Sequence, residues 1–315
     1  MELYTVLGFV GILKESNKIF LKNVKLMAFI TLTILSLHSL LFLSYTFSIK
    51  PLINDFIINA TFLQITTPGT SEYAKLLIAV KKDVKLFVGL EWIFILATSI
   101  TSLFSASITI LAAGVTHIGE DMSIKDLLLR IVKSWKRPFI TGFYITLLDL
   151  GFGFLTWATL SSFMLFFEGP FTSSLPPYFW VILSLAMVFK SYLAVVWNLA
   201  LVVSVLEERR GIDALGRAGN LVKGLKLRGF FLNILFGLLS SVAVPGFKLT
   251  NGKQSTALRV AIVLFFFNCL LVVTMFAMMA FTVFYYECKK NQGEEIESKE
   301  SFEYTKIANT TAALV

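Results

Sequence analysis

The sequence predicts an all-α integral membrane protein with six transmembrane helices, arranged as three repeats of an amphipathic cytoplasmic helix plus a helical hairpin. The chain is 56% hydrophobic and only 15% charged, whereas soluble domains carry about 25% charged residues. Its apolar runs reach the ~20 helical residues that cross ~30 Å of hydrocarbon. They are too continuous for a β-barrel, whose strands alternate over about ten residues.

A repeated phrase predicts the three units. Two apolar residues, Lys, a small or polar residue, an apolar residue and Lys occur in this order three times, each time before a long apolar run: FLKNVK at 20–25, IVKSWK at 131–136 and LVKGLK at 221–226. A second pair lies about ten residues upstream of each copy: Gly11-Ile12, Ser123-Ile124 and Gly211-Ile212. One ancestral unit used three times explains both patterns.

The elements follow in order along the chain. Residues 1–25 form an amphipathic N-terminal helix, 26–286 the membrane domain, and 287–315 a disordered acidic tail. The fifth span is the weakest, because Pro245, Gly246 and Lys248 crowd its end. The second, with 33 residues, is ~50 Å long as one helix and must tilt or project beyond the bilayer. The six spans are placed near 26–48, 86–118, 138–167, 177–206, 229–247 and 257–286.

The basic residues predict the orientation. With the N-terminus in the cytoplasm, inside segments carry seventeen Lys and Arg residues and outside connections carry eight. This asymmetry favours both termini in the cytoplasm of a multi-pass protein. Residues 1–25 are too charged for a cleavable signal peptide, so the first span is expected to act as an uncleaved anchor. The endomembrane system or the plasma membrane is the expected location.

The three short helices carry basic residues beside apolar stripes. In the second copy, the stripe consists of Ile124, Leu127, Leu128, Ile131 and Trp135. Such helices suit an anionic leaflet, and the lipid bilayer is the expected partner, together with unidentified membrane or cytosolic proteins. The alternative is that they only connect spans and cover the bundle. The candidate lipid-facing basic residues are Lys22, Lys25, Lys133, Lys136, Lys223 and Lys226.

Two ionisable residues lie inside predicted spans. Asp149 is about eleven residues into the third span, and Lys190 is about sixteen residues from the cytoplasmic end of the fourth. At 1.5 Å per residue their depths differ by roughly 8 Å. Intramembrane charges are costly and therefore candidate functional groups. They form either a buried or snorkelling pair, or a polar site on an ion or proton pathway.

Other candidate sites are modifications. Asn59-Ala60-Thr61 is a glycosylation sequon on the predicted outer side. Cys288 follows the last span beside two lysines, a position suited to palmitoylation. No metal-ligand spacing accompanies His38 or His117, and no cofactor motif or catalytic set is present. No soluble module offers a nucleic-acid surface. We therefore expect no enzyme activity, no cofactor and no nucleic-acid partner.

One stretch resembles a known family. In 194–229, Trp197 lies in a span that ends in Val203–Glu207, and a helix with Gly211 leads to Lys223-Gly224. This segment, with the Trp-Lys-Arg phrase in 114–140, resembles a plant family of uncharacterised six-span transmembrane proteins. The helix-plus-hairpin repeat is faintly similar to the membrane domains of bacterial glycerophosphodiester phosphodiesterases, whose catalytic domain has no counterpart here. The resemblance implies a plant endomembrane or plasma-membrane protein and no known reaction.

Two functional hypotheses follow. The first is a non-enzymatic membrane-organising or scaffold protein that works through its basic cytoplasmic helices and acidic tail. The alternative is a small-solute or ion transporter or channel with a polar site near Asp149 and Lys190, since repeats around a midplane polar site are common in transporters.

Overall fold

The computed structural model describes residues 2–119, 122–166, 177–242 and 255–294, and the regular structure in these ranges is entirely helical. Five of the described helices, α2, α3, α5, α6 and α10, are long and apolar enough to cross a membrane. The helices are α1 (Glu2–Lys22), α2 (Val24–Ile65), α3 (Ser71–Ile118), α4 (Ile124–Ser134), α5 (Lys136–Phe166), α6 (Pro177–Leu206), α7 (Ile212–Leu221), α8 (Lys226–Ser241) and α10 (Thr256–Asn291).

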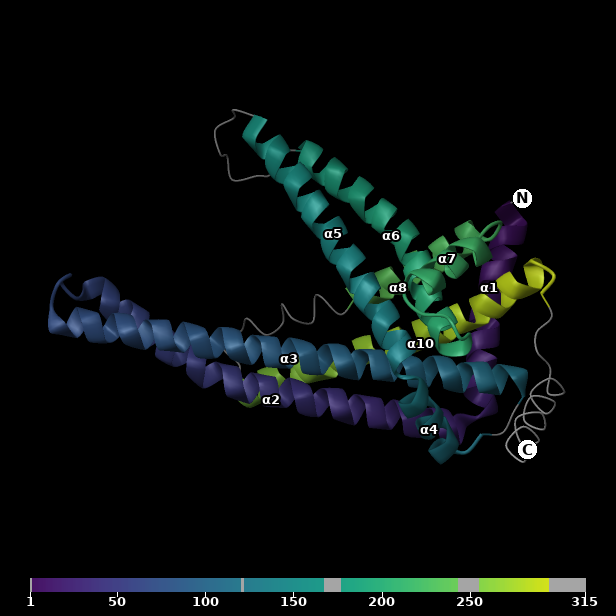
Figure 1. The fold of residues 1–315 in the computed structure, drawn as a ribbon, viewed down its shortest axis with the longest axis horizontal. Coiled ribbons are helices and arrows are strands. Elements are labelled where there is room, and N and C mark those ends of the chain that lie inside the picture. Colours follow the sequence, from purple (N-terminus) through teal and green to yellow (C-terminus); the bar gives the residue numbers. More distant parts are fainter. Residues whose placement is uncertain (1, 120–121, 167–176, 243–254, 295–315) are drawn as a thin grey trace, which may run out of the picture.

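The hairpin of α2 and α3 is longer than expected. These helices have 42 and 48 residues, or about 63 and 72 Å, and extend together away from the rest of the chain (Figure 1). The apolar runs predicted a connection over 49–85, but the chain stays helical through most of it. Turn chemistry is confined to Thr67-Pro68-Gly69, where Gly69 has φ +92°, and the Thr70 hydroxyl then accepts from the Tyr73 N–H at 3.2 Å to begin α3.

The other predicted spans agree with the structure to different degrees. Helices α5 and α6 form a second hairpin, which points in a different direction from α2 and α3 (Figure 1). Their bounds lie within two residues of the predicted 138–167 and 177–206. Helix α8 has 16 residues, or about 24 Å, and is too short to count among the spanning helices. The rest of the predicted fifth span, 243–247, lies outside the described residues.

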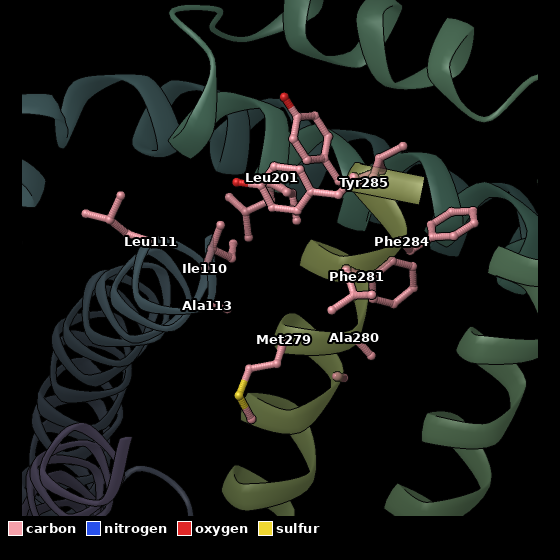
Figure 2. Close-up of a cluster of buried hydrophobic side chains, with 14 of the residues drawn as sticks. Ile110, Leu111, Ala113, Leu201, Met279, Ala280, Phe281, Phe284 and Tyr285 are labelled. Atoms are coloured by element: carbon pink, nitrogen blue, oxygen red, sulfur yellow. The ribbon is translucent and has the colours of Figure 1, made fainter. Parts of the chain in front are cut away.

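The hydrophobic core occupies one end of the molecule. We call this end the base. Three short helices, α1, α4 and α7, lie here. They meet the first turns of α2, α5 and α8 and the last turns of α3, α6 and α10. Residues from three of the long helices form its centre (Figure 2): Ile110 of α3, Leu201 of α6, and Phe281 and Phe284 of α10. Ile110 and Phe284 are completely buried. The hairpins are thus anchored at the base, and their far ends are mostly exposed.

Two glycines allow the helices to approach closely in this core. A Cβ atom on Gly114 of α3 would lie 2.9 Å from Leu206 Cδ2, and one on Gly229 of α8 would lie 2.4 Å from Val195 Cγ1. Real Cβ atoms do not tolerate either distance from a packed side chain. Small residues at helix contacts are the usual means of close packing between membrane helices.

Candidate functional site

Helix α4 presents an apolar surface that no described part of the chain covers. Two of its side chains, Leu127 and Ile131, are almost completely buried against the base. The neighbouring stripe stays open, with Leu129, Val132 and Trp135 68%, 58% and 49% exposed. The apolar face of α4 is therefore wider than the protein surface on which it packs, and its outer half is free to contact something else.

Basic side chains border this open stripe. Lys125, Lys133 and Lys136 are all exposed, and Arg137 forms an ion pair with Glu208, 2.9 Å from Arg137 Nη2 to Glu208 Oε1. Exposed Leu, Val and Trp beside lysines are typical of a helix that lies in the interface of a bilayer, where Trp is also enriched. We call Leu128, Leu129, Val132 and Trp135, with Lys125, Lys133 and Lys136, the α4 surface.

The corresponding short helices also bury one face against the base. Helix α1 buries Ile12, Ser16 and Ile19, and α7 buries Ala214, Ala218 and Leu221. The predicted lysines beside them remain exposed. Lys22 Nζ donates to the Thr116 carbonyl at 3.3 Å, and Lys226 Nζ lies 5.5 Å from the centroid of the Tyr192 ring. Lys25 and Lys223, also predicted, are exposed as well. Among the described side chains, α1 exposes Val10 and Leu21 and α7 exposes Ile212, whereas α4 exposes Leu128, Leu129 and Val132 along one stretch of the helix.

The structure brings Asp149 and Lys190 together. Lys190 Nζ of α6 lies 2.8 Å from Asp149 Oδ1 of α5, and their side chains are 42% and 46% exposed. Lys190 also lines a cleft of about 290 Å³ between α6, α8 and α10. In this cleft Asn233 Nδ2 donates to the Ser191 carbonyl at 3.0 Å, and Asn198 Nδ2 donates to Asn233 Oδ1 at 3.3 Å. The ion pair is the outer end of a short row of polar groups.

A second polar contact inside the spans, between Tyr45 and Glu91, joins α2 and α3. The Tyr45 hydroxyl donates to Glu91 Oε1 at 2.7 Å, at the wall of a cavity of about 400 Å³ that His38 also lines. His38 is buried, with Nδ1 3.0 Å from the Ile34 carbonyl oxygen. The pairing of Tyr45 with Glu91 was not predicted from the sequence. The available signal was a carboxylate within an apolar run.

The base is held by an ion network that the sequence analysis also missed. Glu207, after α6, accepts from Tyr285 Oη at 2.8 Å and from Arg217 Nε of α7 at 3.4 Å. Arg217 Nη2 lies 2.5 Å from Glu294 Oε2. This hydrogen bond raises the pKa of the Arg217 guanidinium and lowers the pKa of Glu294 below its ordinary value. The network ties the end of α10 to α7. The sequence signal for it was Glu207, a carboxylate directly after an apolar run.

The two predicted modification sites lie in packed surroundings. Asn59 lies six residues before the end of α2, and its Nδ2 donates to Asp83 Oδ2 of α3 at 2.8 Å. Cys288 is completely buried, so its thiol is not presented at the surface in this conformation. Across the described ranges, no group of three or more His, Cys, Asp and Glu residues is arranged to hold a metal ion.

Comparison with known proteins gives a family but no named relative. A search of curated proteins found no match, and a search of solved structures found none either. Residues 1–306, almost the whole chain, match the family described as Domain of unknown function (DUF8558). Together with the all-helical fold and its membrane-length apolar helices, this match shows that the chain is a membrane protein that belongs to the DUF8558 family.

Proposed function

We propose that the protein is a non-enzymatic membrane-organising protein that gathers anionic lipids at the cytoplasmic face through the α4 surface. The observation that carries this proposal is the open apolar stripe of Leu129, Val132 and Trp135 beside exposed lysines. Burying a Val or Leu side chain stabilises by about 1.5–3 kcal/mol. Lys residues near an anionic leaflet contribute about 1 kcal/mol each.

The proposal includes the orientation and the repeat. The base faces the cytoplasm with both termini on that side, as the excess of basic residues favours. The units are α1–α2–α3, α4–α5–α6 and α7–α8–α10. Each is an amphipathic helix followed by a pair of apolar helices, of which α8, with 16 residues, is shorter than a membrane span. In the first and third units the short helix packs into the base. The α4 copy keeps its outer face available, which is where contact with the leaflet is needed.

A fluorescent label on α4 tests the proposal. An environment-sensitive probe on Leu129→Cys, in a Cys269→Ser background that removes the exposed native thiol, is read in proteoliposomes with and without phosphatidylserine. We expect a blue-shifted emission that strengthens with the anionic lipid. Replacing both Lys133 and Lys136 by Ala should weaken this insertion by about 2 kcal/mol, roughly 30-fold.

The control label occupies Gly216→Cys, an exposed position of α7 at the same base. Its emission should stay water-like in both lipid mixtures. If the probe on α4 behaves as the probe on α7 does, α4 does not enter the bilayer and the proposed function is wrong. An α4 probe that inserts equally well without phosphatidylserine would contradict the selectivity for anionic lipid.

A transporter or channel is the second candidate, favoured by the cleft that Lys190 and Asn233 line. A membrane-embedded ion pair with polar neighbours is typical of ion and proton routes. On this alternative, purified protein in liposomes gives uptake or ion flux, and both Asp149→Asn and Lys190→Met abolish it. Gly151 lies on the same helix as Asp149 and has open space around its Cβ position, so Gly151→Ala should leave flux unchanged. Absence of flux from folded protein across a broad solute panel would exclude this candidate.

A further inference from the structure

The cavity of about 400 Å³ beside the Tyr45–Glu91 contact lies between α2, α3 and α10. His38 is seven residues before Tyr45 on α2, and Thr98 is seven residues after Glu91 on α3. Seven residues are about two helical turns, or roughly 10 Å. The cavity therefore extends for about two turns, with Glu91 near one end and with His38 and Thr98 near the end closer to the base. Its volume is within the ~300–1,000 Å³ range of small-ligand sites.

The hydroxyl groups in this wall use their donors within the protein. Thr98 Oγ1 and Ser99 Oγ each donate at 2.7 Å to the carbonyl four residues earlier in α3, and the Tyr45 hydroxyl donates to Glu91 Oε1. A hydroxyl whose hydrogen is already bonded presents only its lone pairs to a ligand. These three groups therefore offer the cavity acceptors and no donor.

Two further acceptor atoms of the wall have no hydrogen-bond partner among the described residues. His38 Nδ1 lies 3.0 Å from the Ile34 carbonyl oxygen, which can only accept, so Nε2 of the uncharged ring is an acceptor. Glu91 Oε2 is the second, since Tyr45 is bonded to Oε1. The shielded side-chain atoms without a partner lie on other described residues, so a water-sized molecule can reach both of these atoms.

His38 combines this accessible nitrogen with deep burial. The residue is only 4% exposed, and it also lines a neighbouring cavity of about 120 Å³, so the two spaces meet at its ring. Buried polar side chains are normally hydrogen-bonded. An open acceptor on a residue buried this deeply indicates a ligand that brings a donor to it.

Aromatic rings form much of the remaining wall. Phe42 of α2 stacks on Phe267 of α10 with centroids 5.3 Å apart, and Tyr45 is edge-on to Phe94 at the same centroid distance. The faces of such rings attract organic cations. Glu91 is the only charged side chain among the described residues of the wall, and a carboxylate favours a cation as well.

Other charges lie farther away. On the three helices, the charged residues nearest to the wall are five to eight residues along the chain from it, or about 8–12 Å of helix. They are Lys50, Lys85 and Arg259, all exposed and outside the cavity lining. Charges are screened over about 8 Å at physiological ionic strength. The charge that a ligand meets inside the cavity is therefore the carboxylate of Glu91.

We propose that this cavity binds a protonated organic amine with an apolar or aromatic body. The ammonium group donates to Glu91 Oε2, and the body lies along the Phe42 and Phe267 rings. A hydroxyl at the other end of the body donates to His38 Nε2. A protonated primary amine has three N–H donors and no acceptor, which matches a wall that offers acceptors only.

Soluble amines and membrane amines share this chemistry. Tyramine carries its amine and its hydroxyl at opposite ends of an aromatic ring, and sphinganine carries a primary amine on a long apolar chain. The inference depends neither on insertion of α4 into the bilayer nor on flux past the Asp149–Lys190 pair.

Glu91→Gln removes the charge and keeps the shape of the side chain. The amide oxygen can still accept from the Tyr45 hydroxyl, so the melting temperature should change little. Binding of tyramine should weaken at least about tenfold, because hydrogen bonds to charged groups are the strong ones. Glu72→Gln is the matched control, since Glu72 is an exposed carboxylate of the same helix and lies outside the cavity.

The test is binding of tritium-labelled tyramine, and separately of tritium-labelled sphinganine, to the full chain in phosphatidylcholine nanodiscs. 4-Ethylphenol, which lacks the amine, should compete with tyramine at least about tenfold more weakly than unlabelled tyramine does. This difference should disappear in Glu91→Gln. Binding of sphinganine without binding of tyramine would support the site and assign the amine to the membrane, and the reverse would assign it to solution.

A second competitor tests the contact with His38. 2-Phenylethylamine lacks the hydroxyl and should compete about fivefold more weakly than unlabelled tyramine, the usual contribution of one neutral hydrogen bond. In His38→Leu the two amines should compete equally. 2-Phenylethylamine that competes as well as tyramine in the wild type would contradict the contact between the hydroxyl and His38.

Three outcomes would overturn the proposal. Folded wild-type protein that binds neither tyramine nor sphinganine has no amine site. 4-Ethylphenol that competes as well as tyramine would contradict recognition of the ammonium group. Binding that Glu91→Gln leaves unchanged, or that Glu72→Gln weakens equally, lies elsewhere in the molecule. Because the label on α4 is read separately, failure here leaves the proposed function untouched, and failure of that label leaves this site untouched.

Discussion

Replacing Phe284 with alanine is expected to lower the free energy of unfolding by about 3–5 kcal/mol, the usual cost of removing a fully buried aromatic ring. Phe284 of α10 is completely buried, and its ring packs edge-on to Phe281 with centroids 6.4 Å apart. The ring atoms also lie 3.0–3.1 Å from where a Cβ on Gly229 would be. Helices α8 and α10 therefore meet with no spare volume, and the truncated side chain would leave a cavity.

The measurement is thermal unfolding of the purified protein in one detergent, followed by circular dichroism. Phe265→Ala is the control, since Phe265 is on the same helix but is 64% exposed. Exposed substitutions usually change stability by less than about 0.5 kcal/mol. Equal melting temperatures for the two variants would mean that α10 does not hold the base together as the structure shows.

Replacing Arg217 with methionine is expected to cost about 3 kcal/mol, because removing one partner of a buried ion pair leaves the other charge uncompensated. The side chains of Glu207 and Arg217 are only 16% and 19% exposed. Arg209 Nε also lies 3.4 Å from Glu207 Oε2, and this second cation keeps the expected loss at the lower end of the range. Adding Glu207→Gln to Arg217→Met should restore part of the stability, because position 207, only 16% exposed, then no longer carries a charge.

Arg137→Met provides the comparison. Arg137 pairs with Glu208, whose side chain is 89% exposed, and such surface pairs contribute about 0–1 kcal/mol. Thermal unfolding of the single and double variants measures both. A loss for Arg137→Met as large as that for Arg217→Met would contradict the buried character of the Glu207 network.

The same network gives the base a pH dependence. The Arg217 guanidinium lowers the pKa of Glu294 in the folded protein, so the contact stabilises the fold above the ordinary carboxyl pKa. That contribution is lost as the pH falls through the lowered pKa. In Arg217→Met, the stability should therefore depend less on pH in the acid range than in the wild type.

The sequence predicted the spanning helices best where a proline lies at the start of the apolar run. Apolar runs bounded by Pro138 and Pro177 gave α5 and α6 almost residue for residue. The same reasoning failed for α2 and α3. The end of an apolar run predicts where a helix leaves the hydrocarbon core, but the helix itself can continue beyond that point. Polar residues such as Lys50 and Lys81 end the apolar run, yet neither breaks the backbone, and both helices continue past them.

The site residues also fall into two groups, those that the sequence could predict and those that it could not. Depth along two neighbouring spans was enough to suggest that Asp149 and Lys190 can meet, since each helix rises 1.5 Å per residue. The pairing of Glu207 with Arg217 and Tyr285 depends on how α6, α7 and α10 pack together at the base, and no local sequence pattern predicts that packing. Likewise, Leu127 and Leu128 both belong to the predicted apolar stripe of α4, and only the packing of the base makes the first buried and the second exposed.

The length of the α2–α3 hairpin determines how far its turn can lie from the base. If the hairpin stands upright from a base at the membrane surface, its ~63 Å span the ~30 Å hydrocarbon core and leave the turn at Thr66–Thr70 about 30 Å beyond it. Charges are screened over about 8 Å at physiological ionic strength, so the surface potential of the bilayer does not reach the turn. A protein confined to the headgroup layer cannot touch it. The turn is accessible only to a molecule that arrives from solution or to a neighbour that stands equally tall.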